Sequence, residues 1–180
     1  MPENSNPNNL SKIEDLSKEK LLELLHIYAK NWLAHDGCWF LAIEEKQGME
    51  AAIDFDRESW KRFTIVEARR LKGFLDLGED SGIKGLKVAL GFRMYATLNE
   101  DRIETPDENT LIYYVKSCRV QSARRKKGLP DFPCKSVGIQ EYTLFAKTID
   151  KRFTTKCISC PPEITDEAHH CVWEFRLGEE

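Results

Sequence analysis

The hydrophobic pattern of this 180-residue chain changes near Asn99, and no other feature constrains the fold as strongly. Before this point, apolar residues recur at helical spacing: Leu21, Leu25, Tyr28 and Trp32 follow one another at intervals of four, three and four residues. After it, short runs rich in β-branched and aromatic residues alternate with turn residues, a pattern typical of strands. We therefore predict an α+β fold, in which N-terminal helices pack with a small antiparallel sheet that is crossed by a further helix.

The chain is predicted to form one domain. Its length suits a single core, and its 41% hydrophobic residues supply enough apolar material to fill one. Residues 1–10 are rich in Asn, Pro and Ser, which predicts a disordered tail and leaves residues 11–180 for the domain. Within the domain, residues 11–98 form the helical part and residues 99–180 form the sheet and cysteine-rich part.

Capping and breaking residues divide the helical part. Ser17 is a suitable N-cap for the first helix, Asp36-Gly37 is predicted to break it, and Gly48 ends the helix that follows. The predicted helices cover residues 17–33, 38–47, 49–77 and 83–98.

The second part contains the strands. Residues 102–105 and 110–118 flank the turn sequence PDEN and predict a hairpin. A helix over residues 135–149 precedes two further strands, over 153–159 and 169–177. On the last strand, a period of two places Cys171, Trp173, Phe175 and Leu177 on one face, which we expect to point inward.

Composition narrows the class of protein. The formal net charge of −3 gives no general attraction to nucleic acid or to an anionic membrane. No apolar run approaches the ~20 residues that span a bilayer, and the N-terminus lacks the regions of a secretory signal. We therefore expect a cytoplasmic protein with no nucleic-acid or membrane partner, whose six cysteines are reduced thiols or metal ligands.

Four residues of the cysteine-rich part have spacings that fit a zinc site. Cys157 and Cys160 are separated by two residues, which lets two thiolates reach one tetrahedral ion, and His169 and Cys171 lie two apart on a predicted strand. The alternative is that Cys118, Cys134 and Cys171 are small buried hydrophobic residues and that Cys157 and Cys160 only begin a loop. A thioredoxin-like redox pair is disfavoured, because Pro161-Pro162 prevents a helix after Cys160.

A basic run follows Cys118. Arg119, Arg124 and Arg125 are candidates for binding an anionic group of a small-molecule ligand, because guanidinium groups pair with carboxylates or phosphates through two parallel hydrogen bonds. The alternative is a solvated loop. A local RNA-binding patch is disfavoured, since no aromatic platform accompanies the run.

Several titratable residues are candidates for acid–base chemistry or metal binding. His35, Asp36 and Glu44 cluster around the predicted break between helices and could act in acid–base catalysis or bind a metal. The alternative for His35 and Asp36 is a helix cap. Asp56, Glu67 and Glu141 fall on apolar helix faces, where a carboxylate must be paired, hydrogen-bonded or neutral; for Glu67 the predicted partner is Arg70, one turn away.

The segments NWLAHDGCWFLAIEE, FTIVEARRLK, CRVQSARRKKGLPDFPCK and CPPE…HCVWEF together resemble a family of small prokaryotic cytosolic proteins known as a domain of unknown function. From Cys118 onward the chain also resembles, more distantly, the L-2-amino-thiazoline-4-carboxylic acid hydrolase family, with Cys118, Cys134 and Cys171 as the nearest counterparts of its cysteines and Trp173 as its closing aromatic. In this chain a basic run replaces the acidic position of that family. A weaker resemblance to 4-vinyl-reductase-type domains implies helices over an antiparallel sheet that enclose a small molecule.

Three functional hypotheses follow. The first is a small-molecule-binding protein with a thiol-lined pocket, acting as a hydrolase on a C–N or C–S bond, with a thiolate of Cys118 or Cys134 activated by Arg119 or Lys135. The second is a non-catalytic ligand- or zinc-binding protein, whose Cys3His site stabilises the fold. The third is a partner-binding module, for which exposed aromatic residues on the first helices would be the evidence.

Overall fold

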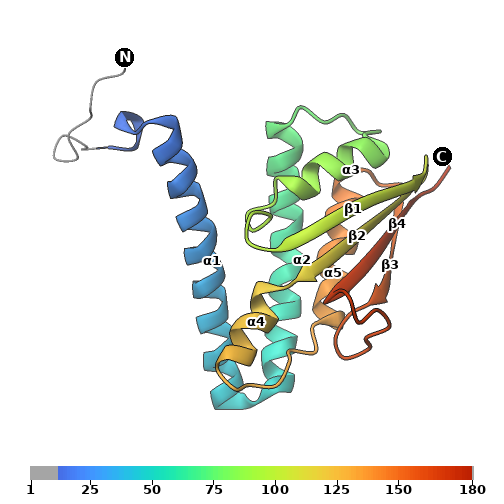
Figure 1. The fold of residues 1–180 in the computed structure, drawn as a ribbon. Helices are drawn as coiled ribbons and strands as arrows, with labels where there is room; N and C mark the ends of the chain where they lie inside the picture. Colours follow the sequence, from blue (N-terminus) through green and yellow to red (C-terminus); the bar gives the residue numbers. More distant parts are fainter. Residues whose placement is uncertain (1–11, 180) are drawn as a thin grey trace.

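The computed structural model describes residues 12–179 and has the predicted α+β architecture. One face of a four-stranded antiparallel sheet is covered by helices, and the long N-terminal helix lies farthest from the sheet (Figure 1). The predicted disordered tail, residues 1–10, lies outside the described residues. None of the described helices is both long and apolar enough to cross a membrane.

The sheet has the strand order β1-β2-β4-β3. The hairpin of β1 (Glu100–Asp107) and β2 (Thr110–Ser117) is confirmed, as are β3 (Phe153–Ser159) and β4 (Cys171–Leu177). The last strand begins at Cys171 and not at residue 169, because His169 and His170 lie in a bend. In this bend the backbone N–H of His170 donates to the carbonyl oxygen of Val115.

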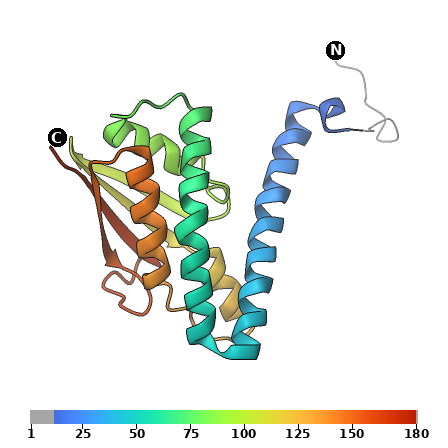
Figure 2. The ribbon, with the colours of Figure 1, turned by 180° about the vertical axis from the view of Figure 1, so that it is seen from behind.

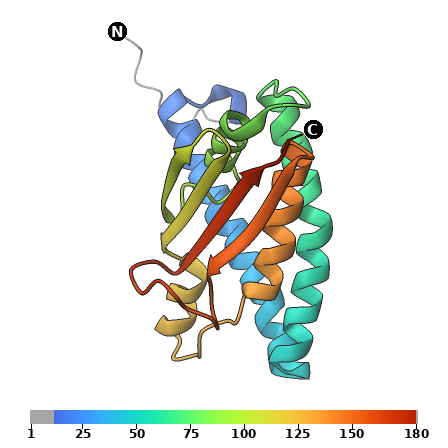
Figure 3. The same cartoon turned by 90° about the vertical axis from the view of Figure 1, so that its right-hand side faces the viewer.

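Helix α5 (Lys135–Ile149) has the bounds that the sequence predicts, and it crosses the inner face of the sheet (Figure 3). Its close approach depends on Gly138, since a Cβ at this position would lie 2.6 Å from the ring of Trp173. The predicted inward face of β4 is confirmed, because Trp173 and Phe175 are buried in the main core with Tyr142 and Phe145 of α5.

Helix α1 (Lys18–Gln47) is continuous, so the predicted break at Asp36-Gly37 is wrong. A glycine inside a helix costs only about 1 kcal/mol, and the apolar stripe continues across it from Trp32 to Phe40, both of which pack against the same cluster. Ser17 is confirmed as the N-cap, because its hydroxyl accepts a hydrogen bond from the backbone N–H of Lys20. Gly48, at a φ of 89°, ends the helix.

Three other helices complete the fold. Helix α2 (Met49–Phe74) packs against α5 and lies between α5 and α1 (Figure 2). Helix α3 (Gly82–Gly91) is shorter than predicted, and the turns that follow it bring Arg93 into the interior. The basic run forms a helix, α4 (Arg119–Lys126), so the alternative of a solvated loop is wrong for this segment.

Candidate ligand cavity

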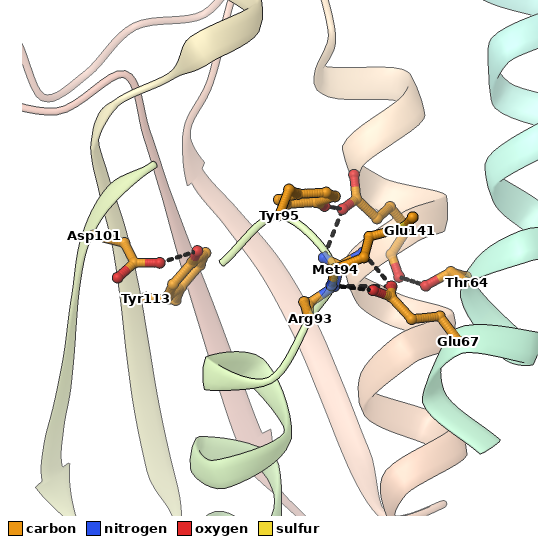
Figure 4. A network of polar contacts seen from close by, with 8 residues as sticks. All are labelled: Thr64, Glu67, Arg93, Met94, Tyr95, Asp101, Tyr113 and Glu141. Atoms are coloured by element: carbon orange, nitrogen blue, oxygen red, sulfur yellow. Dashed lines mark hydrogen bonds and ion pairs between the residues drawn. The ribbon is translucent and has the colours of Figure 1, made fainter. Parts of the chain in front are cut away.

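The buried polar centre of the molecule is formed by Arg93 and two glutamates (Figure 4). The guanidinium group donates from Nε and Nη2 to Oε2 of Glu67, at 3.0 and 2.9 Å, and from Nη1 to Oε1 of Glu141, at 2.6 Å. The predicted pairing of Glu67 with Arg70 is therefore wrong. Arg93 was not identified from the sequence, because the predicted helix over 83–98 ends at Gly91 and the turns after it bring Arg93 into the interior.

Neighbouring groups complete the hydrogen bonding of this cluster. The backbone N–H of Met94 donates to the second oxygen of Glu67, at 2.9 Å, and the hydroxyl of Tyr95 donates to Oε1 of Glu141. The hydroxyl of Thr64 donates to the backbone carbonyl of Glu141 at 3.0 Å, which ties α2 to α5. Both glutamates on apolar helix faces are thus paired and hydrogen-bonded, as the sequence required.

A cavity of about 510 Å³ lies beside this cluster, between α1, α2, α4, α5 and the inner side of the sheet. Aromatic side chains form much of its wall: Trp32, Phe40, Trp60, Tyr95, Phe132, Tyr142 and Trp173.

Three of these rings form a packed group. Trp32 meets Trp60 edge to face, with ring centroids 5.7 Å apart, and stacks on Tyr95 at 5.9 Å. These contacts join α1 to α2 and to the segment after α3, and they hold the cavity wall in one arrangement.

Two aspartates line the cavity from different helices. Asp36 comes from α1 and Asp56 from α2, and both are half-buried. Burial raises the pKa of Asp36 to about 6, and the charge of Glu141 adds to this rise while His35 opposes it. Burial also raises the pKa of Asp56 to about 8; the charges of Asp36 and Glu141 contribute, and a hydrogen bond with the Trp60 side chain opposes them.

The structure separates the predicted catalytic residues His35, Asp36 and Glu44. Asp36 lines the cavity, whereas His35 is exposed and is not part of the cavity wall. Glu44 accepts two hydrogen bonds from Arg124, at 2.7 and 2.9 Å, which lower the pKa of its carboxyl group. A catalytic role for any of the three stays a prediction.

The predicted anion-binding arginines also occupy different environments. Arg124 is buried and paired with Glu44, and it donates to the carbonyl of Pro130 at 2.7 Å. Arg125 is bound by both carboxylate oxygens of Asp131, at 2.8 and 2.6 Å. Arg119 is exposed at the edge of the cavity. Recognition of an anionic ligand stays a prediction, and two of its three guanidinium groups already have a carboxylate partner.

Five cysteines line the cavity: Cys38, Cys118, Cys134, Cys160 and Cys171. The sulfur atoms of Cys134 and Cys160 lie 3.6 Å apart, and all six cysteines are free. Burial raises the pKa of Cys118 to about 12, so that thiol is protonated near neutral pH. This weighs against Cys118 as the nucleophile and leaves Cys134 as the stronger candidate for that predicted role.

The predicted zinc ligands are only partly brought together. Cys160 has hydrogen-bond contacts with Cys157 and Cys171, but also with Cys134. The Nδ1 atom of His169 lies 2.7 Å from Oδ2 of Asp166, outside the strand that was expected to carry it. Over residues 12–179, no group of three or more His, Cys, Asp or Glu side chains has an arrangement that could hold a metal ion. Zinc binding stays a prediction.

The exposed aromatic residues that a partner-binding module requires are present on α1. Tyr28 is 51% exposed and Trp39 is 63% exposed. Their role in binding a partner stays a prediction.

A comparison with family models matches residues 13–177 to one described as a family of unknown function (DUF6125). This match confirms the resemblance to a domain of unknown function that the sequence motifs predicted. No curated protein and no solved structure matches the chain. The distant resemblances to the hydrolase family and to 4-vinyl-reductase-type domains stay predictions.

Proposed function

The chain belongs to the family of unknown function DUF6125, and we propose that it is a small-molecule-binding protein whose ligand occupies the cavity beside α1. The observation that carries this proposal is the cavity itself. Its volume of about 510 Å³ falls within the range of about 300–1,000 Å³ that is usual for sites of drug-sized ligands.

The composition of the wall supports the same function. Ligand sites are mostly apolar and aromatic, with a few convergent polar groups that fix the orientation of the ligand. Here seven aromatic side chains line the same cavity as Asp36, Asp56 and Cys134.

Gly37 gives further support, because it leaves room where a side chain would stabilise the helix. It lies inside α1, lines the cavity, and has no heavy atom within 4 Å of an added Cβ. A helical glycine costs about 1 kcal/mol relative to alanine, and here that cost has no compensating close contact within the chain. The free space fits a ligand that lies against the helix at this point.

The experiment is a fragment screen, read by ligand-observed NMR, with a matched pair of variants. Gly37→Leu places a branched side chain in the cavity, whereas Gly73→Leu adds the same side chain near the end of α2, where an added Cβ also meets nothing within 4 Å. We expect fragments that bind the wild-type protein to bind Gly73→Leu equally and to lose binding to Gly37→Leu. Fragments that bind all three proteins equally would place the site elsewhere and overturn the proposal.

The hydrolase hypothesis adds a chemical step to this binding function. It requires a thiolate in the cavity, and Cys134 is the candidate because it lines the wall, and its sulfur lies 3.7 Å from Nε2 of Gln121. Once a ligand with a C–N or C–S bond is known, Cys134→Ser is expected to abolish turnover and to leave binding intact. Retained turnover in this variant would exclude Cys134 as the nucleophile.

A further inference from the structure

The charges of the cavity interior do not balance. Four cationic residues contribute to its wall, but Lys30, Arg119 and Lys127 are exposed on the outer side, and buried Arg124 is already paired with Glu44. The charge of Arg93, behind the wall, is met by Glu67 and Glu141.

Asp36 and Asp56 are the two carboxylates left over. Asp36 has no hydrogen-bond or ion-pair partner among the described residues, and Asp56 has one hydrogen bond, with the side chain of Trp60. Each carboxylate is half-buried, and each helix brings its aspartate to the same cavity. A partly buried carboxylate without a cationic partner is costly, and a bound cation would remove that cost.

The surrounding rings favour the same kind of group. Aromatic faces attract cations through their quadrupole, and Trp and Tyr rings beside carboxylates are the usual setting in which proteins hold protonated amines or quaternary ammonium groups. Trp32, Trp60 and Tyr95 lie together at centroid distances of 5.7 to 6.0 Å and line the same cavity as the two aspartates. Trp60 and Tyr95 already face one cation, because the guanidinium carbon of Arg93 lies 5.7 and 4.8 Å from their ring centroids. A metal ion fits less well, because no group of three or more candidate ligands is arranged for one within the described part of the chain.

We infer that the ligand of this cavity carries a positively charged nitrogen, which lies between Asp36 and Asp56 while the apolar remainder of the ligand contacts the aromatic wall. This inference rests on the proposed small-molecule-binding function and names the chemical class of its ligand: an organic cation with an apolar body. It differs from the anionic ligand that the basic run predicted.

The raised pKa values of the aspartates make this recognition dependent on pH. The titratable and charged groups around the pair come from several elements: Lys30 and His35 on α1, Arg93 and Tyr95 after α3, Arg119, Arg124 and Lys127 on or just after α4, Glu141 and Tyr142 on α5, and the thiols of the cavity wall. Burial raises the pKa of Tyr95 and Tyr142 well above the usual tyrosine range, so neither phenol ionises near neutral pH. Because Asp36 and Asp56 lose their protons near pH 6 and 8, cation binding should strengthen as the pH rises through that interval.

The test uses pairs of probes that differ only in charge. Phenyltrimethylammonium and tert-butylbenzene have the same shape, and the charge of the first does not titrate; a panel of such pairs with longer apolar groups extends the comparison. Binding is measured by calorimetry or ligand-observed NMR on the full chain. The variant is Asp36→Asn with Asp56→Asn, which keeps the shape of both side chains, and the control is Asp54→Asn, an exposed aspartate on the same helix as Asp56.

Near pH 8, we expect the dissociation constant of the cation to be at least about tenfold lower than that of its neutral isostere for the wild-type protein. The double variant should bind both probes about equally and lose the pH dependence, and the Asp54→Asn protein should behave as wild type. If the wild-type protein binds both members of each pair equally, and Gly37→Leu abolishes that binding, the cation inference fails while the proposed function stands. If no pair binds the wild-type protein, both fall.

Discussion

Replacing Arg93 with methionine tests whether the buried cluster holds the fold together. The side chain of Arg93 is 3% exposed, and it is the cationic partner of Glu67 and Glu141, which are 7% and 11% exposed. Methionine fills much of the same apolar volume but leaves both carboxylates without their cation. Removing one partner of a buried ion pair costs about 3–5 kcal/mol, so we expect the free energy of unfolding to fall by about that amount.

The measurement is urea unfolding at pH 7, followed by tryptophan fluorescence. For a domain of this size, each kcal/mol lowers the melting temperature by about 2–4 °C, so a parallel thermal scan should show a decrease of roughly 6–20 °C. The matched control is Arg70→Met, because Arg70 is exposed on α2 and is the partner that local spacing predicts for Glu67. Its loss should stay within about 0.5 kcal/mol. Equal losses in the two variants would refute the assignment of Arg93 as the partner that stabilises the fold.

Three further perturbations have defined outcomes. Because the pKa of Asp56 is raised to about 8 in the folded protein, the folded state keeps this proton between about pH 4 and 8, whereas the unfolded chain releases it near pH 4. Wild-type stability should therefore fall by up to about 1.4 kcal/mol per pH unit near neutrality, and urea unfolding across pH should show a smaller slope for Asp56→Asn. Gly138→Ala should lower the free energy of unfolding by about 1–3 kcal/mol in the same assay, since its Cβ would overlap the ring of Trp173. Gly73→Ala, whose Cβ would meet open space, should be neutral or slightly stabilising. Similar effects of the two substitutions would contradict the packing argument. Oxidation by the disulfide-forming reagent diamide should link Cys134 to Cys160, whose sulfurs lie 3.6 Å apart, and peptide mapping that finds another pairing would contradict this proximity.

The elements that sequence predicted most accurately are those with local signals. The bounds of α5 agree because Pro133 precedes it and the following strand begins with a β-branched and aromatic run. The strands agree because their period of two is set by neighbouring residues. The break at Gly37 was wrong for the opposite reason: the packing of Trp32 and Phe40 against one cluster favours a continuous helix, and that contact with residues distant in sequence has no local signal.

The candidate site shows the same division. The apolar helix faces marked Asp56 and Glu141 as carboxylates that need an explanation, and Asp36 stood out beside His35. The sequence does not show that Asp36 and Asp56 lie close to each other, because this proximity comes from the tertiary contact between α1 and α2. The sequence also could not identify the ion-pair partner of Glu141, since Arg93 is one of 27 Lys and Arg residues and lies 48 positions earlier in the chain.

Glu141 links the stability of the fold to the chemistry of the cavity. It accepts hydrogen bonds from Arg93 and Tyr95 on one side, and it lines the cavity on the other, where its charge contributes to the raised pKa of both Asp36 and Asp56. The charge that anchors α5 to the segment after α3 therefore also holds the cavity carboxylates closer to their protonated forms. A bound cation would lie beside three carboxylates, of which only Glu141 has a guanidinium partner, and it would favour the ionised state of the aspartates. Binding of such a cation would consequently be coupled to proton release, through a residue whose ion pair with Arg93 also joins parts of the fold.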